Sequence, residues 1–80
     1  MKMTRFSNRK EASLPISEIA KSFARVFNST DGDRVIKHLR SITFERCFGA
    51  EASEEILRFS EGQKALVAHI EALIKSGSGE

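Results

Sequence analysis

The chain has 80 residues, 40% of them hydrophobic and 30% charged, with one cysteine, one proline and five glycines. This composition predicts one compact domain with polar ends, and it excludes a second domain, an internal disulfide and a zinc site built on pairs of thiolates. The longest apolar runs are a few residues, so no membrane span is expected, and the lone cysteine favours a reducing cytoplasm. Because so small a domain buries only about 60% of its unfolded surface, an oligomer is plausible from size alone.

The net charge of +2 is distributed unevenly along the chain. Residues 1–16 contain four basic residues and one acidic residue, a charge of +3, whereas the remainder contains nine basic and ten acidic residues, a charge of −1. Residues 1–14 show no sustained periodicity and are expected to form a flexible basic arm. Such an arm can lie along nucleic acid, although a tail without a partner is the commoner case. Its candidate phosphate contacts are Lys2, Arg5, Arg9 and Lys10.

The first helix is expected to begin between Pro15 and Ser17 and to end at Asn28 and Ser29. Its apolar residues fall on one face: Ile19, Ala20, Phe23, Ala24, Val26 and Phe27.

The second helix has a strong start signal. Ser29 or Thr30 can act as N-cap, and Asp31 and Asp33 favour the positive end of the helix dipole. Its expected apolar arc contains Val35, Ile36, Leu39, Ile42 and Thr43. Phe44 lies off that arc, so either the helix unwinds there or Phe44 makes a contact of its own. The outer face carries Arg34, Lys37 and Arg40, which could meet phosphates, but nearby acidic residues dilute this field.

The third helix follows a break at Phe48-Gly49-Ala50 and admits two interpretations. One long helix over about residues 53–75, bent or straight at Gly62, keeps a single apolar stripe, which consists of Ile56, Phe59, Leu66, Val67, Ile70, Leu73 and Ile74. Alternatively, Ser60-Glu61-Gly62-Gln63 matches a capping box and begins a new helix. We favour the long helix because the apolar register survives across Gly62. Residues 76–80 are expected to be a flexible tail. The fold class is therefore all-α, a small three-helix bundle over residues 15–75.

No catalytic, cofactor or metal site is expected, and the chain is not expected to be an enzyme. His38 and His69 lack partners at ligand spacing, and Cys47, between two phenylalanines, is better interpreted as a buried, inert thiol. The more informative group is Gly62, Gln63 and Lys64, because a mid-helix glycine is costly and a glutamine on an apolar stripe needs a partner. Candidate contacts for a protein partner are Phe44, Phe48, Gly62, Gln63 and Lys64.

Three segments together resemble a family of small phage and prophage helical proteins. They are Phe23-Ala24-Arg25-Val26-Phe27, then Asp31-Gly32-Asp33-Arg34-Val35-Ile36 with Leu39-Arg40, and finally Glu61-Gly62-Gln63-Lys64 with Val67 and Ile70. The similarity covers about residues 20–74. Lys64 stands where the family pattern has arginine, and Cys47-Phe48-Gly49 departs from a loop that is often richer in proline and aspartate.

The resemblance implies a non-enzymatic virion structural or assembly protein, located in the virion or the host cytoplasm. Its partners would be other phage structural proteins or copies of itself, with no membrane or small-molecule substrate. A nucleic-acid-binding accessory protein, for DNA packaging or regulation, is the alternative, and a host-directed inhibitor is a third possibility.

Overall fold

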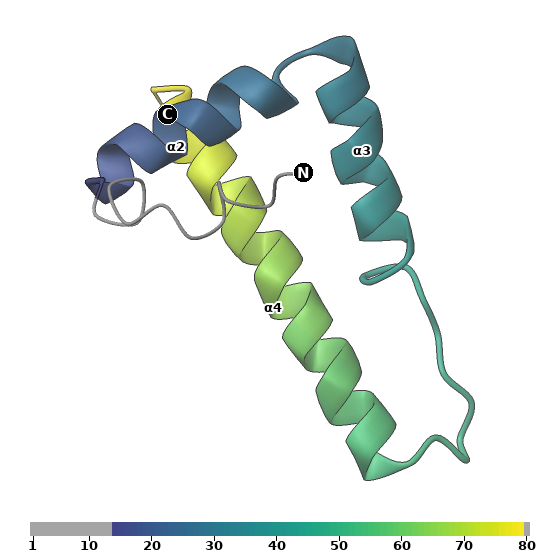
Figure 1. Ribbon diagram of the computed structural model, residues 1–80. Coiled ribbons are helices and arrows are strands. Elements are labelled where there is room, and N and C mark those ends of the chain that lie inside the picture. Colours follow the sequence, from purple (N-terminus) through teal and green to yellow (C-terminus); the bar gives the residue numbers. More distant parts are fainter. Residues whose placement is uncertain (1–13, 80) are drawn as a thin grey trace, which may run out of the picture.

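The computed structural model describes residues 14–79, which form three helices; the first two are joined by a short connection and the last two by the long segment of residues 42–53 (Figure 1). They are α2 (Ile16–Phe27), α3 (Thr30–Ser41) and α4 (Glu54–Gly77). No strand occurs within residues 14–79, so the expected all-α fold is confirmed. The expected basic arm lies outside the described residues.

Helix α2 begins directly after Pro15, whose extended backbone (φ −61°, ψ 149°) leads the chain into the first turn. It ends at Asn28, which has left the helical conformation and donates its side-chain amide to Ser78 Oγ at 2.8 Å. This bond ties the end of α2 to the residue that follows α4.

A tight elbow connects α2 to α3. Ser29 is the N-cap of α3, and its Oγ accepts a hydrogen bond from the amide of Gly32 at 2.9 Å while donating to the carbonyl of Val26 at 3.1 Å. Gly32 is buried against the end of α2, and a Cβ at this position would overlap the backbone of Val26 and Phe27, so only glycine fits. The sequence Ser-Thr-Asp-Gly thus encodes both the cap and the close approach of the two helices.

Helix α4 is continuous across Gly62, which confirms the single long helix and rejects a new start at Ser60. Its N-cap is Ser53, whose Oγ accepts a hydrogen bond from the amide of Ile56 at 3.1 Å. The helix extends to Gly77, so Ser76 and Gly77, expected in the tail, form its last two residues.

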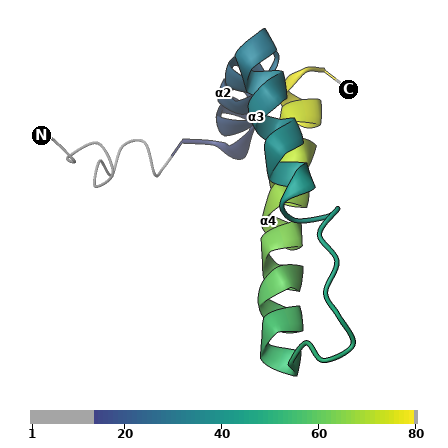
Figure 2. The ribbon, with the colours of Figure 1, turned by 90° about the vertical axis from the view of Figure 1, so that its right-hand side faces the viewer.

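The helices meet at one end of the molecule. Helix α2 crosses the C-terminal part of α4, α3 lies beside them, and the N-terminal part of α4 extends beyond both (Figures 1 and 2). Within residues 14–79 four apolar residues are buried, namely Ala20, Ala24, Val67 and Leu73. The radius of gyration of 15.5 Å exceeds the roughly 11 Å of a compact chain of this length. The core is therefore small and the molecule is elongated.

The structure corrects two expectations about burial. Val35 and Ile42 were expected in the apolar arc of α3, but they are 50% and 44% exposed, because α3 ends at Ser41 and contacts α4 along only part of its length. Cys47 is exposed rather than buried, since it lies in the extended segment between α3 and α4, away from the core.

Candidate interaction surface

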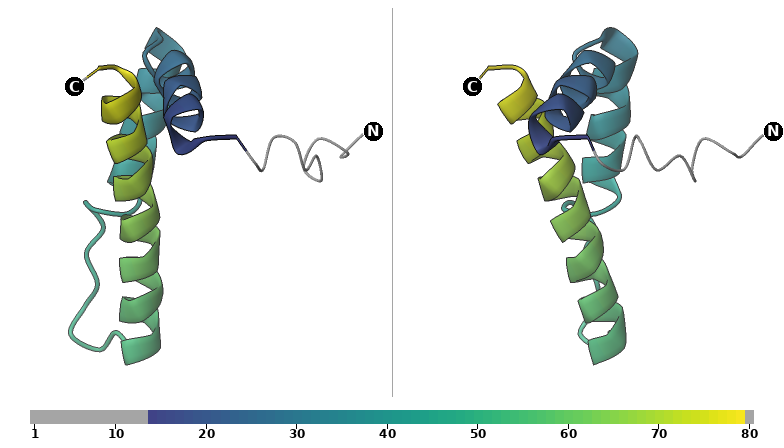
Figure 3. Two further views of the ribbon diagram at one scale, coloured as in Figure 1. Left: turned by 90° about the vertical axis from the view of Figure 1, so that its left-hand side faces the viewer. Right: turned by 60° about the vertical axis from the view of Figure 1, so that its left-hand side comes forward.

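The apolar stripe of α4 separates into two faces with different surroundings. Val67 is buried and Ile74 half-buried on the face turned toward α3, whereas Leu73 is buried on the face crossed by α2. Below this crossing Phe59 and Leu66 on the second face are 69% and 60% exposed, and Ile56, five turns below Ile74 at the border of the two faces, is 47% exposed. Figure 3 shows α4 continuing past α2 with this side open.

The other side of the N-terminal half of α4 is covered by the chain itself. Thr43 and Ser60 are buried at 5% and 4% exposure, and the Thr43 hydroxyl donates to the carbonyl of Leu39 at 2.7 Å. Phe44 lies under the Arg40 guanidinium, 4.5 Å from ring centroid to Cζ, and Phe48 lies under Arg46 at 5.4 Å. Both predicted aromatic contacts are therefore already covered in part by arginines of their own chain.

The remaining predicted contacts lie near the middle of α4. Gly62 is exposed, and a Cβ built on it meets nothing within 4 Å. Gln63 is half-buried, on the same helix face as Phe59 and Leu66. Lys64 is half-buried on a different face, where its ammonium lies 3.3 Å from the Glu61 carboxylate. The structure thus places Gly62 and Gln63, but not Lys64, beside the open stripe.

Acidic neighbours compensate the predicted basic face of α3. Arg34 lies 3.6 Å from Asp31, and Lys37 lies 2.9 Å from Asp33, whose hydrogen bond and charge raise the pKa of Lys37. Arg40 donates to both carboxylate oxygens of Glu71, at 2.7 and 2.8 Å. Arg40 therefore joins α3 to α4 rather than facing outward as an unpaired cation, and the face has little net positive field. The four predicted contacts of the arm, Lys2, Arg5, Arg9 and Lys10, lie outside the described residues.

The groups capable of acid–base or metal chemistry are dispersed. Within residues 14–79 no three His, Cys, Asp or Glu side chains lie close enough to hold a metal ion. His38, His69 and Cys47 are all exposed and lie on different elements. No helix of the described part of the chain is long and apolar enough to cross a membrane.

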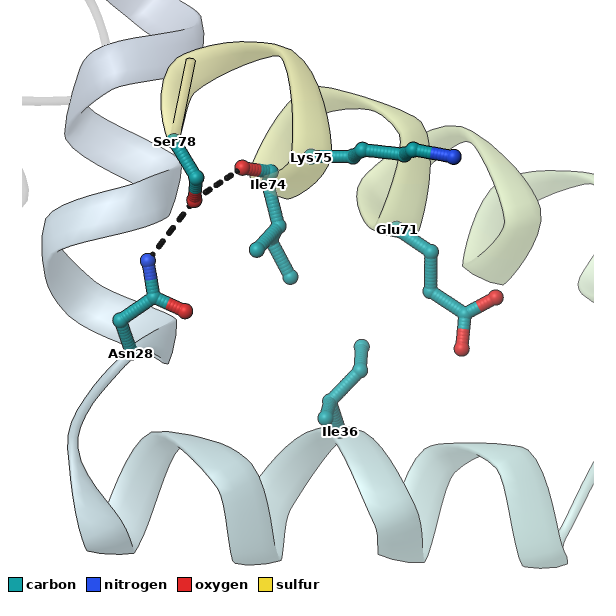
Figure 4. Close-up of a pocket in the computed structure, with 6 residues that line it drawn as sticks. All are labelled: Asn28, Ile36, Glu71, Ile74, Lys75 and Ser78. Carbon is teal, nitrogen blue, oxygen red and sulfur yellow. Dashed lines mark hydrogen bonds between the residues drawn. The ribbon is translucent and has the colours of Figure 1, made fainter. Parts of the chain in front are cut away.

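A pocket lies where the end of α2, α3 and the C-terminal end of α4 meet (Figure 4). Apart from Lys75, its polar residues are bonded internally: Asn28 donates to Ser78 Oγ, which donates to the carbonyl of Ile74 at 2.7 Å, and Glu71 is held by Arg40. Ile36 and Ile74 supply its apolar side. The pocket is therefore part of the joint between the helices rather than a reactive site.

Sequence reasoning missed a second open surface, on α2. Ser22, Phe23, Val26 and Phe27 line an apolar groove, in which the two phenylalanine rings stack at 6.1 Å between centroids. Val26 is 62% exposed. The helical pattern placed Phe23, Val26 and Phe27 on one apolar face, but it does not show how much of that face a crossing helix covers. The signal that could have found the groove is the width of that apolar arc.

The comparison with known protein families matches residues 23–75 to the model of a Bbp19-like phage protein. This chain belongs to the family of Bbp19-like phage proteins. The matched region spans all of α3, nearly all of α4 and the C-terminal part of α2, so it contains the elbow, the Arg40–Glu71 pair and the open stripe. The expected phage origin is thereby confirmed. No curated protein and no solved structure matches the chain.

Proposed function

We propose that this member of the Bbp19-like family is a non-enzymatic structural or assembly protein that acts through protein–protein contacts in or near the virion. The observation that carries the proposal is the open apolar surface of α4, where Ile56, Phe59 and Leu66 are each about half exposed or more. Contiguous exposed apolar surface marks interaction sites on small proteins. Family membership supplies the phage context.

The small core supports the same proposal. With four buried apolar residues, the described part of the chain has a small core, and proteins of this size commonly gain further burial from a partner. The dispersed titratable groups give a reaction no assembled site within residues 14–79. A role as a contact protein uses the surfaces that the fold leaves open.

Mass spectrometry of phage particles tests this proposal. The phage that encodes the chain is purified by density gradient, and the chain is quantified per particle together with its abundance in assembly intermediates. We expect a defined copy number in one of these fractions. An infected-cell pool with no chain in particles or intermediates would contradict the proposal.

Binding of duplex DNA by the purified chain tests the nucleic-acid alternative. A DNA-binding accessory protein loses affinity steeply as salt rises, by an amount set by the number of phosphates it contacts. Because Arg34, Lys37 and Arg40 are each paired with a carboxylate, we expect these three residues to add little to such binding. Strong salt-dependent binding of duplex DNA that Lys37→Gln weakens severalfold would favour the alternative instead.

A further inference from the structure

Nothing in the described part of the chain, residues 14–79, requires glycine at position 62. Glycine in the interior of a helix is destabilising, and α4 places Gly62 nine residues inside a 24-residue helix. At Gly32 and Gly77 the chain's own backbone fills the space of a side chain, whereas the space around Gly62 is empty. Within residues 14–79, therefore, no contact accounts for the missing side chain at Gly62.

The residues beside Gly62 have the spacing of a helix-pairing seam. Ile56, Phe59, Gln63 and Leu66 follow one another at intervals of three, four and three residues, and Ile70, Leu73 and Gly77 continue the alternation. This period of 3.5 residues is the one that keeps a seam turned toward a second helix. Helix α2 crosses the upper part of the seam at Leu73 and Gly77, so the lower part, from Ile56 to Leu66, is free.

We propose that the free part of this seam binds the same part of α4 from a second copy of the chain, with the two helices antiparallel. The proposal rests on the proposed function, contact between proteins, and names one partner. Pairing is centred near residue 61, so that Ile56 meets Leu66 of the second copy and Phe59 meets its Gln63. Gly62 then meets Gly62 of the second copy at the edge of the seam, which explains the missing side chain.

The position of α2 sets the antiparallel direction. Because α2 crosses the seam near the C-terminal end of α4, a parallel partner would bring its own α2 to the same level, where two crossing helices compete for one space (Figure 3). In the antiparallel arrangement the two α2 helices lie at opposite ends. The N-terminus of the second α4 ends level with about residue 68, before the crossing.

Charge favours the same direction. Glu55 and His69 flank the seam on the side of Gly62, and both are exposed. Antiparallel pairing places Glu55 beside His69 of the second copy, whereas in a parallel pair Glu55 would face the opposite flank of the partner helix, at Ser60. The antiparallel arrangement therefore gives the Glu55 carboxylate a basic neighbour, whereas the parallel one gives it none.

The available area defines the expected strength. Phe59 and Leu66 are 69% and 60% exposed and Ile56 is 47% exposed, so the seam contributes roughly 400 Å² per chain, or about 800 Å² in the pair. That area is below the roughly 1,200 Å² at which stable specific interfaces begin, so the pair is a weak, reversible dimer rather than a permanent one. Gln63 in the seam weakens pairing and fixes its register, as polar seam residues do.

Sedimentation equilibrium of the full chain from 1 µM to 1 mM, on the order of the affinities expected, tests the dimer. We expect a monomer–dimer equilibrium that Phe59→Asp or Leu66→Asp weakens at least 100-fold. The matched control is Leu57→Asp, which introduces the same charge at an exposed leucine of α4 outside the seam and should change the dissociation constant by less than threefold. Circular dichroism checks that each variant keeps its helices.

Cysteine cross-linking tests the direction. In a Cys47→Ser background, Glu55→Cys with His69→Cys should give a dimer joined by disulfides between position 55 of one copy and 69 of the other. Within one chain these positions lie about 21 Å apart along α4 and cannot be bridged. Peptide mapping that finds 55 joined to 55, or 69 to 69, would overturn the antiparallel arrangement.

Other outcomes separate this inference from the proposed function. A chain that is monomeric at 1 mM, or a dimer insensitive to both seam variants, overturns the inference. If that monomer is still found in particles and loses its place there with Phe59→Asp, the seam binds another phage protein and the proposed function stands. A seam-dependent dimer that is absent from particles and intermediates supports the inference and removes the proposed function.

Discussion

Replacing Gly77 with alanine tests the crossing of α2 over α4. A Cβ at this position would overlap the carbonyl group of Ala20 and lie 2.8 Å from the amide nitrogen of Lys21. These are backbone atoms, so no side-chain rotation relieves the overlap, and α2 must move away from α4. Because Ala20 and Ala24 are buried at this crossing, the movement loosens half of the buried apolar core.

The magnitude follows from two opposing effects. Overpacking costs about 1–3 kcal/mol, and the better helix propensity of alanine returns less than about 1 kcal/mol at the last residue of a helix. We therefore expect Gly77→Ala to destabilise the chain by about 1–2 kcal/mol, which lowers the Tm by roughly 5–15 °C in a domain of this size.

Gly62→Ala in the same helix is the control. Nothing lies within 4 Å of its Cβ, so it should stabilise the isolated monomer by about 1 kcal/mol. Urea denaturation followed by far-UV circular dichroism, at a concentration well below that of the expected dimer, measures both free energies of unfolding. The reasoning is refuted if the two substitutions change stability in the same direction.

Three further outcomes are expected. Ser29→Ala removes the N-cap of α3 and should cost about 1 kcal/mol in urea denaturation. Ser41 lies at the opposite, exposed end of α3, where its hydroxyl donates to the carbonyl of His38, so Ser41→Ala should lower the free energy of unfolding much less. Equal losses for the two substitutions would contradict the capping role of Ser29. A double-mutant cycle of Arg40→Met and Glu71→Gln should give a coupling of about 0.5–1 kcal/mol that falls with added salt, since the pair is partly exposed. A coupling of zero would mean that the pair does not join α3 to α4. Ellman's reagent should react with Cys47 in the folded protein as fast as after urea treatment, because the thiol is exposed. A much slower reaction in the folded protein would show that the thiol is buried.

Local signals in the sequence predicted the helices well, because each boundary depends on a few neighbouring residues. The cap at Ser29, the aspartates that follow it and Pro15 before α2 act within one helical turn, and all three helices occur where the pattern indicates them. The continuity of α4 was also predictable, since its apolar register persists through Gly62. The end of α4 was not, because Gly77 is held in the helix by its contact with α2, which no local pattern records.

Burial was harder to predict than helix position. Helical periodicity identifies which residues share a face, but a face is buried only as far as another element reaches. Val35 and Val26 share faces with residues that are buried or half-buried, yet both are exposed, because α4 covers only part of the apolar face of α2 and of α3. The seam from Ile56 to Leu66 is open for the same reason. Helix α4 has 24 residues, whereas α2 and α3 have twelve each, so its N-terminal half extends beyond them. This difference in length could have been read from the expected helices.

The division of α4 into a covered and an open half also connects folding to association. The C-terminal half supplies Val67 and Leu73 to the core, whereas the N-terminal half is continuous with it but adds no buried apolar residue. Burying the open half in a dimer would stabilise the same helix that supports α2 and α3, so folding and pairing are thermodynamically linked. The melting temperature of the native chain should therefore rise with protein concentration, while that of Phe59→Asp should not. Differential scanning calorimetry between 10 µM and 1 mM, roughly spanning the expected dissociation constant, measures the difference. A concentration-independent Tm for both proteins would show that the open half of α4 is not coupled to a second copy.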